Sequence, residues 1–240
     1  MELRGITALV TGGARRVGKA IALGLAESGC NLVLHFNRSA DEAEATADEA
    51  RAFGVSVRTV GADLATDAPA AVWGAAELAP VRVLVNSAAM FTEDSLAGVE
   101  RDTLEKTLAV NLIGPVLLTA AFAAAIPDGV DGAVVNITDW RTARPYPDHF
   151  SYSVSKGALD TFTLAAAEVL APRIRVNAVA LGAILPPAGK DSAYLKALAR
   201  EIPVERIGGT TPVVQAVRAL LENDFVTGEI VRVDGGAHLR

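Results

Sequence analysis

The start of the chain restricts the fold more than any other part, because an apolar run, a glycine-containing turn and a helical run follow one another there. Residues 6–10 are predicted to form a buried strand, and residues 19–28 have the apolar spacing of a helix. Between them, Gly12 can turn the chain away from the strand, and Gly18 lets the helix lie close to the sheet. A plain tight turn would also fit residues 11–18. The flanking strand and helix favour a phosphate-binding loop, because free N–H groups at a helix N-terminus attract an anion.

Strand and helix patterns alternate along the rest of the chain. The other expected strands are 31–36, 55–60, 81–85, 132–137, 175–181 and 229–233. The other expected helices are 41–53, 68–78, 101–126, a run through Tyr152 that ends before Pro172, and 212–221. This order and the length of 240 residues predict a single α/β domain over residues 1–240, with most of the nucleotide-binding half in 1–90. Residues 182–205 contain several prolines and glycines and are expected to form a flap over the site.

Composition and charge exclude several classes of protein. Hydrophobic residues make up 51% and charged residues 21% of the chain, as in globular α/β proteins. The net charge of −6, from 22 basic and 28 acidic residues, argues against general binding to nucleic acids or anionic membranes. No apolar run reaches the ~18 residues of a membrane span, and residues 1–11 lack a signal-peptide pattern, so we expect a cytoplasmic protein. The single cysteine, Cys30, cannot form an internal disulfide, and no metal site is expected.

The end of the second predicted strand carries basic and polar side chains but no acid. A cofactor with a free ribose 2′-hydroxyl usually meets Asp or Glu about 20 residues after the first glycine, whereas a 2′-phosphate is bound by arginine. Arg16 and Arg38 are therefore predicted to bind a 2′-phosphate, together with His35, Asn37 and Ser39. In the alternative interpretation, Arg38 is a solvated turn residue and His35 an ordinary side chain at a strand end.

A candidate catalytic set lies between residues 136 and 156. The strand predicted at 132–137 places Asp139 beyond its end, where parallel sheets carry active-site residues. Tyr152 and Lys156 are four residues apart, so a helix places them on one face. An ammonium beside a phenol favours the phenolate, so Lys156 is expected to lower the pKa of Tyr152 and make it a useful proton donor. The same spacing also occurs where a surface lysine merely lies beside a half-buried tyrosine.

Asn111 lies between apolar residues in the long helical run 101–126. A polar amide in such a place needs hydrogen-bond partners. Two interpretations remain open at this stage: Asn111 ties down a helical irregularity, or it holds a water molecule linked to the lysine.

Several motifs in sequence order make the chain resemble the short-chain dehydrogenase/reductase family. They are Thr11-Gly12 with Gly18, Asn86-Ser87-Ala88, Asn111, Tyr152 with Lys156, and Val233-Asp234-Gly235-Gly236. The resemblance covers nearly everything from residue 9 to 236. It implies a doubly wound Rossmann fold, with helices on both faces of a seven-stranded parallel sheet, and a homotetramer.

The resemblance also implies a nicotinamide cofactor across the carboxyl edge of the sheet. Tyr152 would be the proton donor, Lys156 its modulator and Asn111 the anchor of a water relay. Including the residues predicted above, the expected cofactor-binding set is Gly12, Arg15, Arg16, Val17, Gly18, His35, Asn37, Arg38, Ser39, Asp63, Leu64, Asn86, Ser87, Ala88, Lys156 and Gly182. Without the resemblance, Asp63 would be read as an ordinary turn or cap residue.

Four departures from the usual family pattern narrow the resemblance. Where the family usually has the middle glycine of the loop, this chain has Arg16, and where the family has a second asparagine after the fourth strand, it has Ser87. Leu181 replaces the usual proline after the sixth strand, and Asp139 replaces the usual serine. The arginine in the loop, the His-x-x-Arg-Ser segment after the second strand and the aspartate are similar to the pteridine reductases and the bacterial dihydromonapterin reductases. In those enzymes NADPH reduces a dihydropterin or biopterin ring, and the aromatic residue that matches Phe91 stacks on it.

Three functions are therefore compared. The favoured hypothesis is an NADPH-dependent reductase of a small-molecule pterin, with Asp139, Tyr152 and Phe91 at the substrate; which dihydropterin is used, or whether dihydrofolate is, stays open. The first alternative is a general carbonyl reductase of the 3-oxoacyl or sugar-alcohol type. An ionised Asp139 cannot donate a hydrogen bond to a carbonyl as serine does, although Thr138 could replace it. The second alternative is a dinucleotide-sensing protein without turnover, which would have no need of a proton donor.

Overall fold

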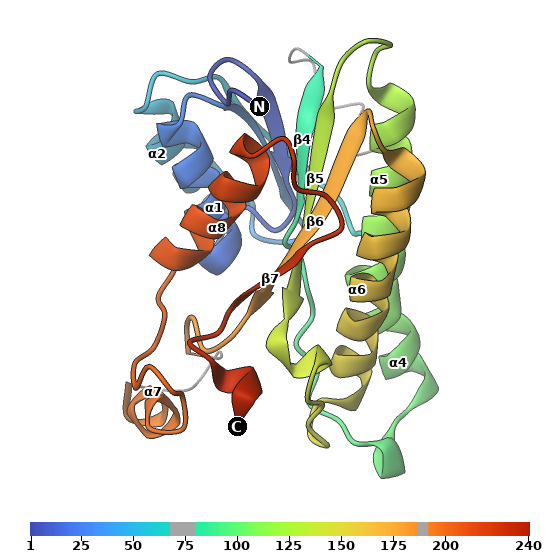
Figure 1. Ribbon diagram of the computed structural model, residues 1–240, viewed down its shortest axis with the longest axis vertical. Helices are drawn as coiled ribbons and strands as arrows, with labels where there is room; N and C mark the ends of the chain where they lie inside the picture. The colour runs from blue at the N-terminus through green and yellow to red at the C-terminus, as the bar shows by residue number, and fades with distance from the viewer. Residues whose placement is uncertain (68–79, 187–191) are drawn as a thin grey trace.

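The computed structural model describes residues 1–67, 80–186 and 192–240, and one parallel sheet forms its centre (Figure 1). The strands are β1 (Thr7–Val10), β2 (Asn31–Phe36), β3 (Val57–Gly61), β4 (Val81–Asn86), β5 (Gly132–Asp139), β6 (Ile174–Leu181) and β7 (Ile230–Val233). They lie in the order β3-β2-β1-β4-β5-β6-β7, and neighbours pair in parallel. The predicted doubly wound, seven-stranded sheet is confirmed. The strand order reverses between β1 and β4, and ligands of such sheets bind beyond the carboxyl ends of the strands at this point.

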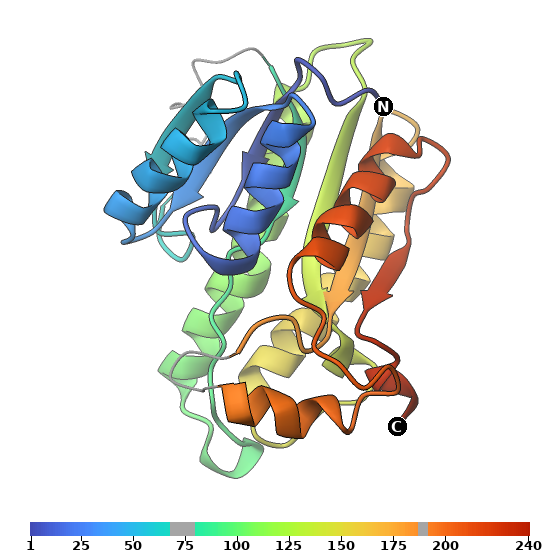
Figure 2. The ribbon, with the colours of Figure 1, turned by 90° about the vertical axis from the view of Figure 1, so that its left-hand side faces the viewer.

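Helices cover both faces of the sheet (Figures 1 and 2). One face carries α1 (Arg16–Glu27), α2 (Ala40–Arg51) and α8 (Thr211–Glu222), and the other carries α4 (Arg101–Leu108), the π-helical turn η2 (Ala109–Ile113), α5 (Gly114–Ala125) and α6 (Phe150–Leu170). The shorter helices are η1 (Leu96–Gly98), η3 (Trp140–Thr142), α7 (Ser192–Ala199) and η4 (Ala237–Leu239). The helix predicted at 68–78 lies outside the described residues, and so do residues 187–191 of the predicted flap.

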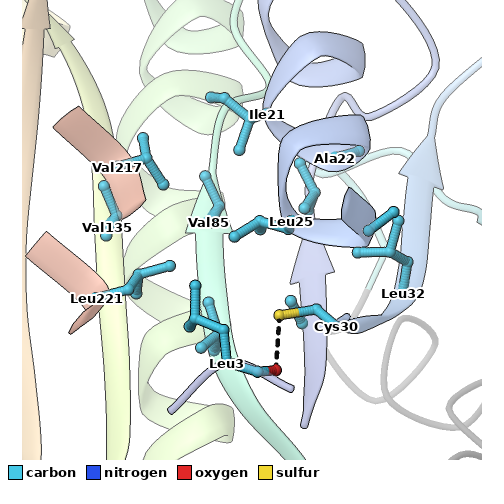
Figure 3. Close-up of a cluster of buried hydrophobic side chains, with 14 of the residues drawn as sticks. Leu3, Ile21, Ala22, Leu25, Cys30, Leu32, Val85, Val135, Val217 and Leu221 are labelled. Carbon is cyan, nitrogen blue, oxygen red and sulfur yellow. Dashed lines mark hydrogen bonds between the residues drawn. The ribbon is translucent and has the colours of Figure 1, made fainter. Parts of the chain in front are cut away.

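The central strands divide their side chains between two hydrophobic cores. Val83 and Val85 of β4 belong to the core beneath α1 and α8, part of which Figure 3 shows. Leu84, which lies between them in sequence, belongs to the core beneath α5 and α6. Successive side chains of a strand point to opposite faces, and here both faces are covered. This is why the strands appear in the sequence as continuous apolar runs.

The helical stretch Arg101–Ala125 is long and apolar enough to cross a membrane, judged by length and composition. The expectation that no stretch reaches that length was therefore wrong. In the structure this stretch is a layer of the fold, because Leu118 and Phe122 are buried in the second core. Its other side leaves Ile113 and Leu117 about half exposed. Packing against the sheet explains the apolar residues on the buried side.

Cys30 lies in the first core (Figure 3) and donates a hydrogen bond to the Leu3 carbonyl oxygen at 3.1 Å. Burial raises the pKa of the thiol to about 12. Because the thiolate is the reactive species, we expect native protein to leave Ellman's reagent unreacted and guanidinium-unfolded protein to react with one equivalent. Rapid reaction of the native protein would contradict a closed core around Cys30.

Candidate functional site

The loop between β1 and α1 requires glycine at both predicted positions. Gly12 has a φ of +64°, and a Cβ on it would lie 2.9 Å from the Ala88 Cα. A Cβ on Gly18 would lie 2.1 Å from the Gly12 carbonyl oxygen. Helix α1 begins at Arg16, earlier than predicted, and no side chain caps its N-terminus. The N–H groups of its first turn are therefore available to an anion.

Arg16 adopts a left-handed conformation with a φ of +55°. This conformation favours glycine and costs other residues roughly 1–3 kcal/mol. The guanidinium donates to the Pro186 carbonyl oxygen at 2.6 Å, so the side chain reaches the segment after β6. The expected contact of Arg16 with a 2′-phosphate, beside Arg38, stays a prediction.

His35 is 1% exposed, and both of its ring nitrogens are used inside the protein. The Gly12 N–H donates to Nδ1 at 3.3 Å, and Nε2 lies 3.0 Å from the Ala62 carbonyl oxygen. Burial lowers the pKa of His35, which favours the neutral ring that this arrangement needs. The prediction that His35 contacts a 2′-phosphate is wrong, because the ring instead fixes the Gly12 turn to the ends of β2 and β3.

The polar residues after β2 remain accessible. Asn37 and Arg38 are exposed and Ser39 is half-buried, so all three can meet a phosphate at this edge. Arg15 is also at the surface, where its guanidinium lies 3.6 Å from the Glu42 carboxylate. The Val17 side chain packs against the first core, and its expected contact with the cofactor stays a prediction.

The segment after β4 is fixed by a residue to which the sequence analysis gave no role of its own. The Thr11 hydroxyl accepts hydrogen bonds from the backbone N–H groups of Ser87 and Ala88 at 2.9 and 3.0 Å. Thr11 thus joins the two loops at the point where the strand order reverses. The Asn86 side chain is buried and donates to Asn136 Oδ1 at 2.9 Å, so it acts between strands of the sheet.

Three further expected cofactor residues have structural roles of their own. Asp63 accepts a hydrogen bond from the Ala65 N–H at 3.0 Å, which is the turn geometry expected of an aspartate after a strand. Leu64, next to it, is half-buried. A Cβ on Gly182 would lie 2.5 Å from the Asp234 Cα, so glycine is needed where the ends of β6 and β7 meet.

Asn111 is fully buried in the π-helical turn that interrupts the long helix. Its Oδ1 accepts from the Met90 N–H at 2.8 Å, and its Nδ2 donates to the Met90 carbonyl oxygen and to Ser155 Oγ at 2.9 and 3.0 Å. The interpretation of a helical irregularity is confirmed. The amide also fixes the backbone next to Phe91 and joins it to the helix that carries Tyr152.

Asp139 and Tyr152 are in direct contact, as expected from their positions at a strand end and on a helix. The Tyr152 hydroxyl donates to Asp139 Oδ2 at 2.9 Å, while Asp139 Oδ1 accepts from the Arg141 N–H at 2.9 Å. Burial raises the pKa of Asp139. Burial, followed by the Asp139 carboxylate, raises the pKa of Tyr152 well above its ordinary value. The phenol therefore stays protonated and is a donor rather than a phenolate.

Lys156 does not have the predicted effect on Tyr152. Its Nζ donates to the Ile137 carbonyl oxygen at 2.8 Å and lies 5.9 Å from the centre of the Tyr152 ring. Lys156 is 2% exposed, and burial lowers its own pKa to about 8. The expectation that the ammonium lowers the tyrosine pKa is corrected, because burial and the carboxylate determine that pKa in this structure.

The lowered pKa of Lys156 predicts a pH dependence. Below about 8 the amine is charged, and as pH rises through about 8 it loses its proton. We expect kcat to fall along the same alkaline limb, because the buried positive charge beside the proton donor disappears. Arginine stays charged, so the normalised pH–rate profile of Lys156→Arg should lose this limb. An unchanged limb in the variant would assign the ionisation to another group.

Phe91 lies beside the pair and is 47% exposed, so part of its ring is free to contact a ligand. Its ring meets the Tyr152 ring edge-on, with centroids 4.7 Å apart. The His149 ring stacks on Phe91 at 4.0 Å, and its Nδ1 lies 2.7 Å from the Thr92 carbonyl oxygen. One face of Phe91 is therefore covered by His149, the Arg141 guanidinium also lies over the ring at 5.7 Å, and the exposed part of the ring is what a flat ligand could contact.

The sequence analysis missed two side chains at this site. Asp94 accepts hydrogen bonds from the N–H and the hydroxyl of Ser151 and so caps the helix that carries Tyr152. Arg141 places its guanidinium 4.4 Å from the centre of the Tyr146 ring. An acidic residue far from a helix in sequence gives no capping signal. Arg141 could have been noticed, because it follows Asp139 by two residues.

Comparisons with known proteins agree with this geometry. Residues 12–238 match the family model described as enoyl-(acyl carrier protein) reductase. The chain is 31% identical to a short-chain type dehydrogenase/reductase of Picea abies, over 98% of this chain and 93% of that protein. It is 31% identical to the 3-oxoacyl-[acyl-carrier-protein] reductase of Staphylococcus epidermidis, over 97% and 99%. Among solved structures, FolM alternative dihydrofolate reductase 1 from Brucella canis, complexed with NADP, is 39% identical over 100% and 96% of the two chains, with a TM-score of 0.96. The chain therefore belongs to the short-chain dehydrogenase/reductase family of oxidoreductases.

Proposed function

We propose that this protein is an NADPH-dependent reductase of a pterin ring. The observation that carries the proposal is the buried contact between the Tyr152 hydroxyl and Asp139, with the half-exposed Phe91 ring against the same tyrosine. This arrangement combines a proton donor, an acceptor carboxylate and an aromatic surface, which suit a flat ring rich in N–H groups. The similar Brucella canis structure, named as a FolM alternative dihydrofolate reductase, supports the same substrate class.

The residues around the carboxyl edge fit a dinucleotide phosphate. The glycine-lined loop and the uncapped start of α1 would hold a pyrophosphate, and Arg38 with Ser39 would hold a 2′-phosphate. NADPH, when bound, supplies the hydride. The protein's own residues supply and hold the proton: Tyr152 gives it to the ring nitrogen next to the reduced carbon, and Asp139 orients the hydroxyl or returns a proton to it. The raised pKa of Tyr152 keeps the proton on its hydroxyl until the step occurs.

The alternative is a general carbonyl reductase, and the similarity to the Staphylococcus epidermidis 3-oxoacyl reductase favours it. The contact at Tyr152 favours the pterin instead. The two oxygens of Asp139 already accept hydrogen bonds from the Tyr152 hydroxyl and the Arg141 N–H, so in its carboxylate form Asp139 offers a carbonyl oxygen no donor.

NADPH oxidation measured with dihydrobiopterin, dihydromonapterin, dihydrofolate and an acetoacetyl thioester tests the proposal. We expect one of the three pterins to give the highest kcat/KM. A higher value for the thioester would replace the pterin reductase by the carbonyl reductase, and the absence of turnover with all four would favour a nucleotide sensor. The same series identifies the pterin.

Arg38 is expected to determine the choice between NADPH and NADH. One charge-assisted contact to a phosphate contributes roughly 1.5–3 kcal/mol, which corresponds to a preference of about ten- to a hundredfold. Arg38→Asp should weaken or invert this preference, since it removes the contact and adds a repulsive carboxylate. Arg58→Asp, a change of the same charge on β3, serves as the control. Equal kcat/KM of the wild type with both cofactors would contradict a 2′-phosphate site.

We further propose a homotetramer in the cytoplasm. The apolar side chains that η2, α5 and α6 leave exposed support self-association; among them are Ile113, Leu117, Val154 and Leu164. Light scattering at several protein concentrations measures the assembly directly.

A further inference from the structure

Arg141 is a cation of the site whose charge acts on the Asp139 carboxyl, but whose guanidinium forms no direct ion pair in the described part of the chain. Its guanidinium carbon is 4.4 Å from the centre of the Tyr146 ring and 5.7 Å from that of Phe91. Among the described residues, no carboxylate forms an ion pair with it. Its Nη1 is buried and has no hydrogen-bond partner in that part of the chain.

A buried, unpaired guanidinium nitrogen is costly to the folded protein. A charged donor without an acceptor forfeits more than the roughly 1–3 kcal/mol of a neutral one. The arrangement is therefore explained if a ligand supplies the missing acceptor. The two aromatic rings hold the guanidinium in place by cation–π contact without using its N–H groups.

The position of Arg141 indicates which part of a ligand it meets. Its own backbone N–H donates to one oxygen of Asp139, whose other oxygen accepts a hydrogen bond from the Tyr152 hydroxyl. Its guanidinium lies near the ring of Phe91. A flat ligand in contact with Phe91 and Tyr152 would thus have one edge near the hydroxyl and the guanidinium together.

We propose that Arg141 binds the 4-oxo oxygen of a pterin on the same ring edge that receives the proton from Tyr152. This inference rests on the proposed pterin reduction. In a 7,8-dihydropterin the C6=N5 bond is reduced, and its π electron pair becomes the new N5–H bond when the Tyr152 proton arrives. The C4 oxygen lies beside N5 on that edge, within reach of a second donor. Arg141 would therefore select an acceptor at this position and reject a donor.

Binding of two pteridines to the protein–NADP complex tests the proposal. Pterin carries an oxo group at C4, whereas 2,4-diaminopteridine carries an amino group there. Titration calorimetry at a pH at which both are neutral would compare wild type, Arg141→Met and Arg141→Lys. Arg144→Met is the matched control, because Arg144 lies three residues further on and is exposed.

We expect Arg141→Met to weaken pterin binding by about ten- to a hundredfold, as for one charged hydrogen bond, and diaminopteridine binding by less than about threefold. Arg141→Lys should recover part of the loss, and Arg144→Met should bind both ligands as the wild type does. Equal weakening of both ligands by Arg141→Met would show a packing role and overturn the inference, as would unchanged pterin affinity. If wild type and Arg141→Met bind pterin with the same dissociation constant, the role of Arg141 is overturned and the proposed function is not. A wild type that binds neither ligand and reduces no dihydropterin overturns the proposed function with it.

Discussion

Tyr152→Phe is expected to abolish turnover and to leave NADPH binding unchanged. The substitution removes one oxygen, which is the donor to Asp139, while the ring keeps its edge-on contact with Phe91. Loss of a positioned proton-transfer group lowers kcat by about 10²–10⁴, and the Tyr152 hydroxyl is the group that lies between Asp139 and the ring of Phe91. The measurements are kcat from NADPH oxidation and the dissociation constant of NADPH from fluorescence titration.

A control for this variant lies on the same helix. Thr161→Val removes a hydroxyl from the exposed side of α6 and should keep wild-type kcat. Near-normal rates for the phenylalanine variant would make Tyr152 a core residue. A loss of NADPH binding would point instead to collapse of the loop around Phe91.

Asp139→Ala is expected to lower kcat by about 10²–10⁴ with a smaller effect on KM, since the carboxylate contacts the proton donor rather than the expected ring-stacking surface. The variant also removes the acceptor of the Arg141 N–H, which caps η3. That cap contributes about 1 kcal/mol to the stability of the folded protein. Melting temperatures must therefore accompany the kinetics, so that rates are compared on folded protein.

Asp139→Ser separates the two candidate reactions. It restores the hydroxyl that ordinary members of the family carry, so the activity with an acetoacetyl thioester should rise relative to that with a dihydropterin. Asp139→Asn keeps the shape but cannot carry the proton, and it should be as slow as the alanine variant. Full pterin activity in the serine variant would exclude a role of the carboxylate in the reaction.

The sequence by itself determined the architecture and the outline of the site. Apolar runs and helical spacing located the strands and the longer helices of the described part of the chain, because both faces of a parallel sheet must be covered by apolar side chains. Gly12 and Gly18 were identified correctly because the absence of a Cβ is a local requirement that any chain at this turn must meet. The contact between Asp139 and Tyr152 could be expected from the sequence, because Asp139 was placed at a strand end and Tyr152 on the face of the following helix.

Only the tertiary structure decided what depends on burial and on partners distant in sequence. His35 became an internal hydrogen-bonding residue because β2 is covered on both sides, and Arg16 turned towards Pro186. The pKa of Tyr152 rises although a lysine lies one helical turn away, because desolvation and a carboxylate in contact outweigh an ammonium whose hydrogen bond goes elsewhere. The pKa of a side chain depends on its exposure and on the nearest charge, and neither can be read from spacing along the chain.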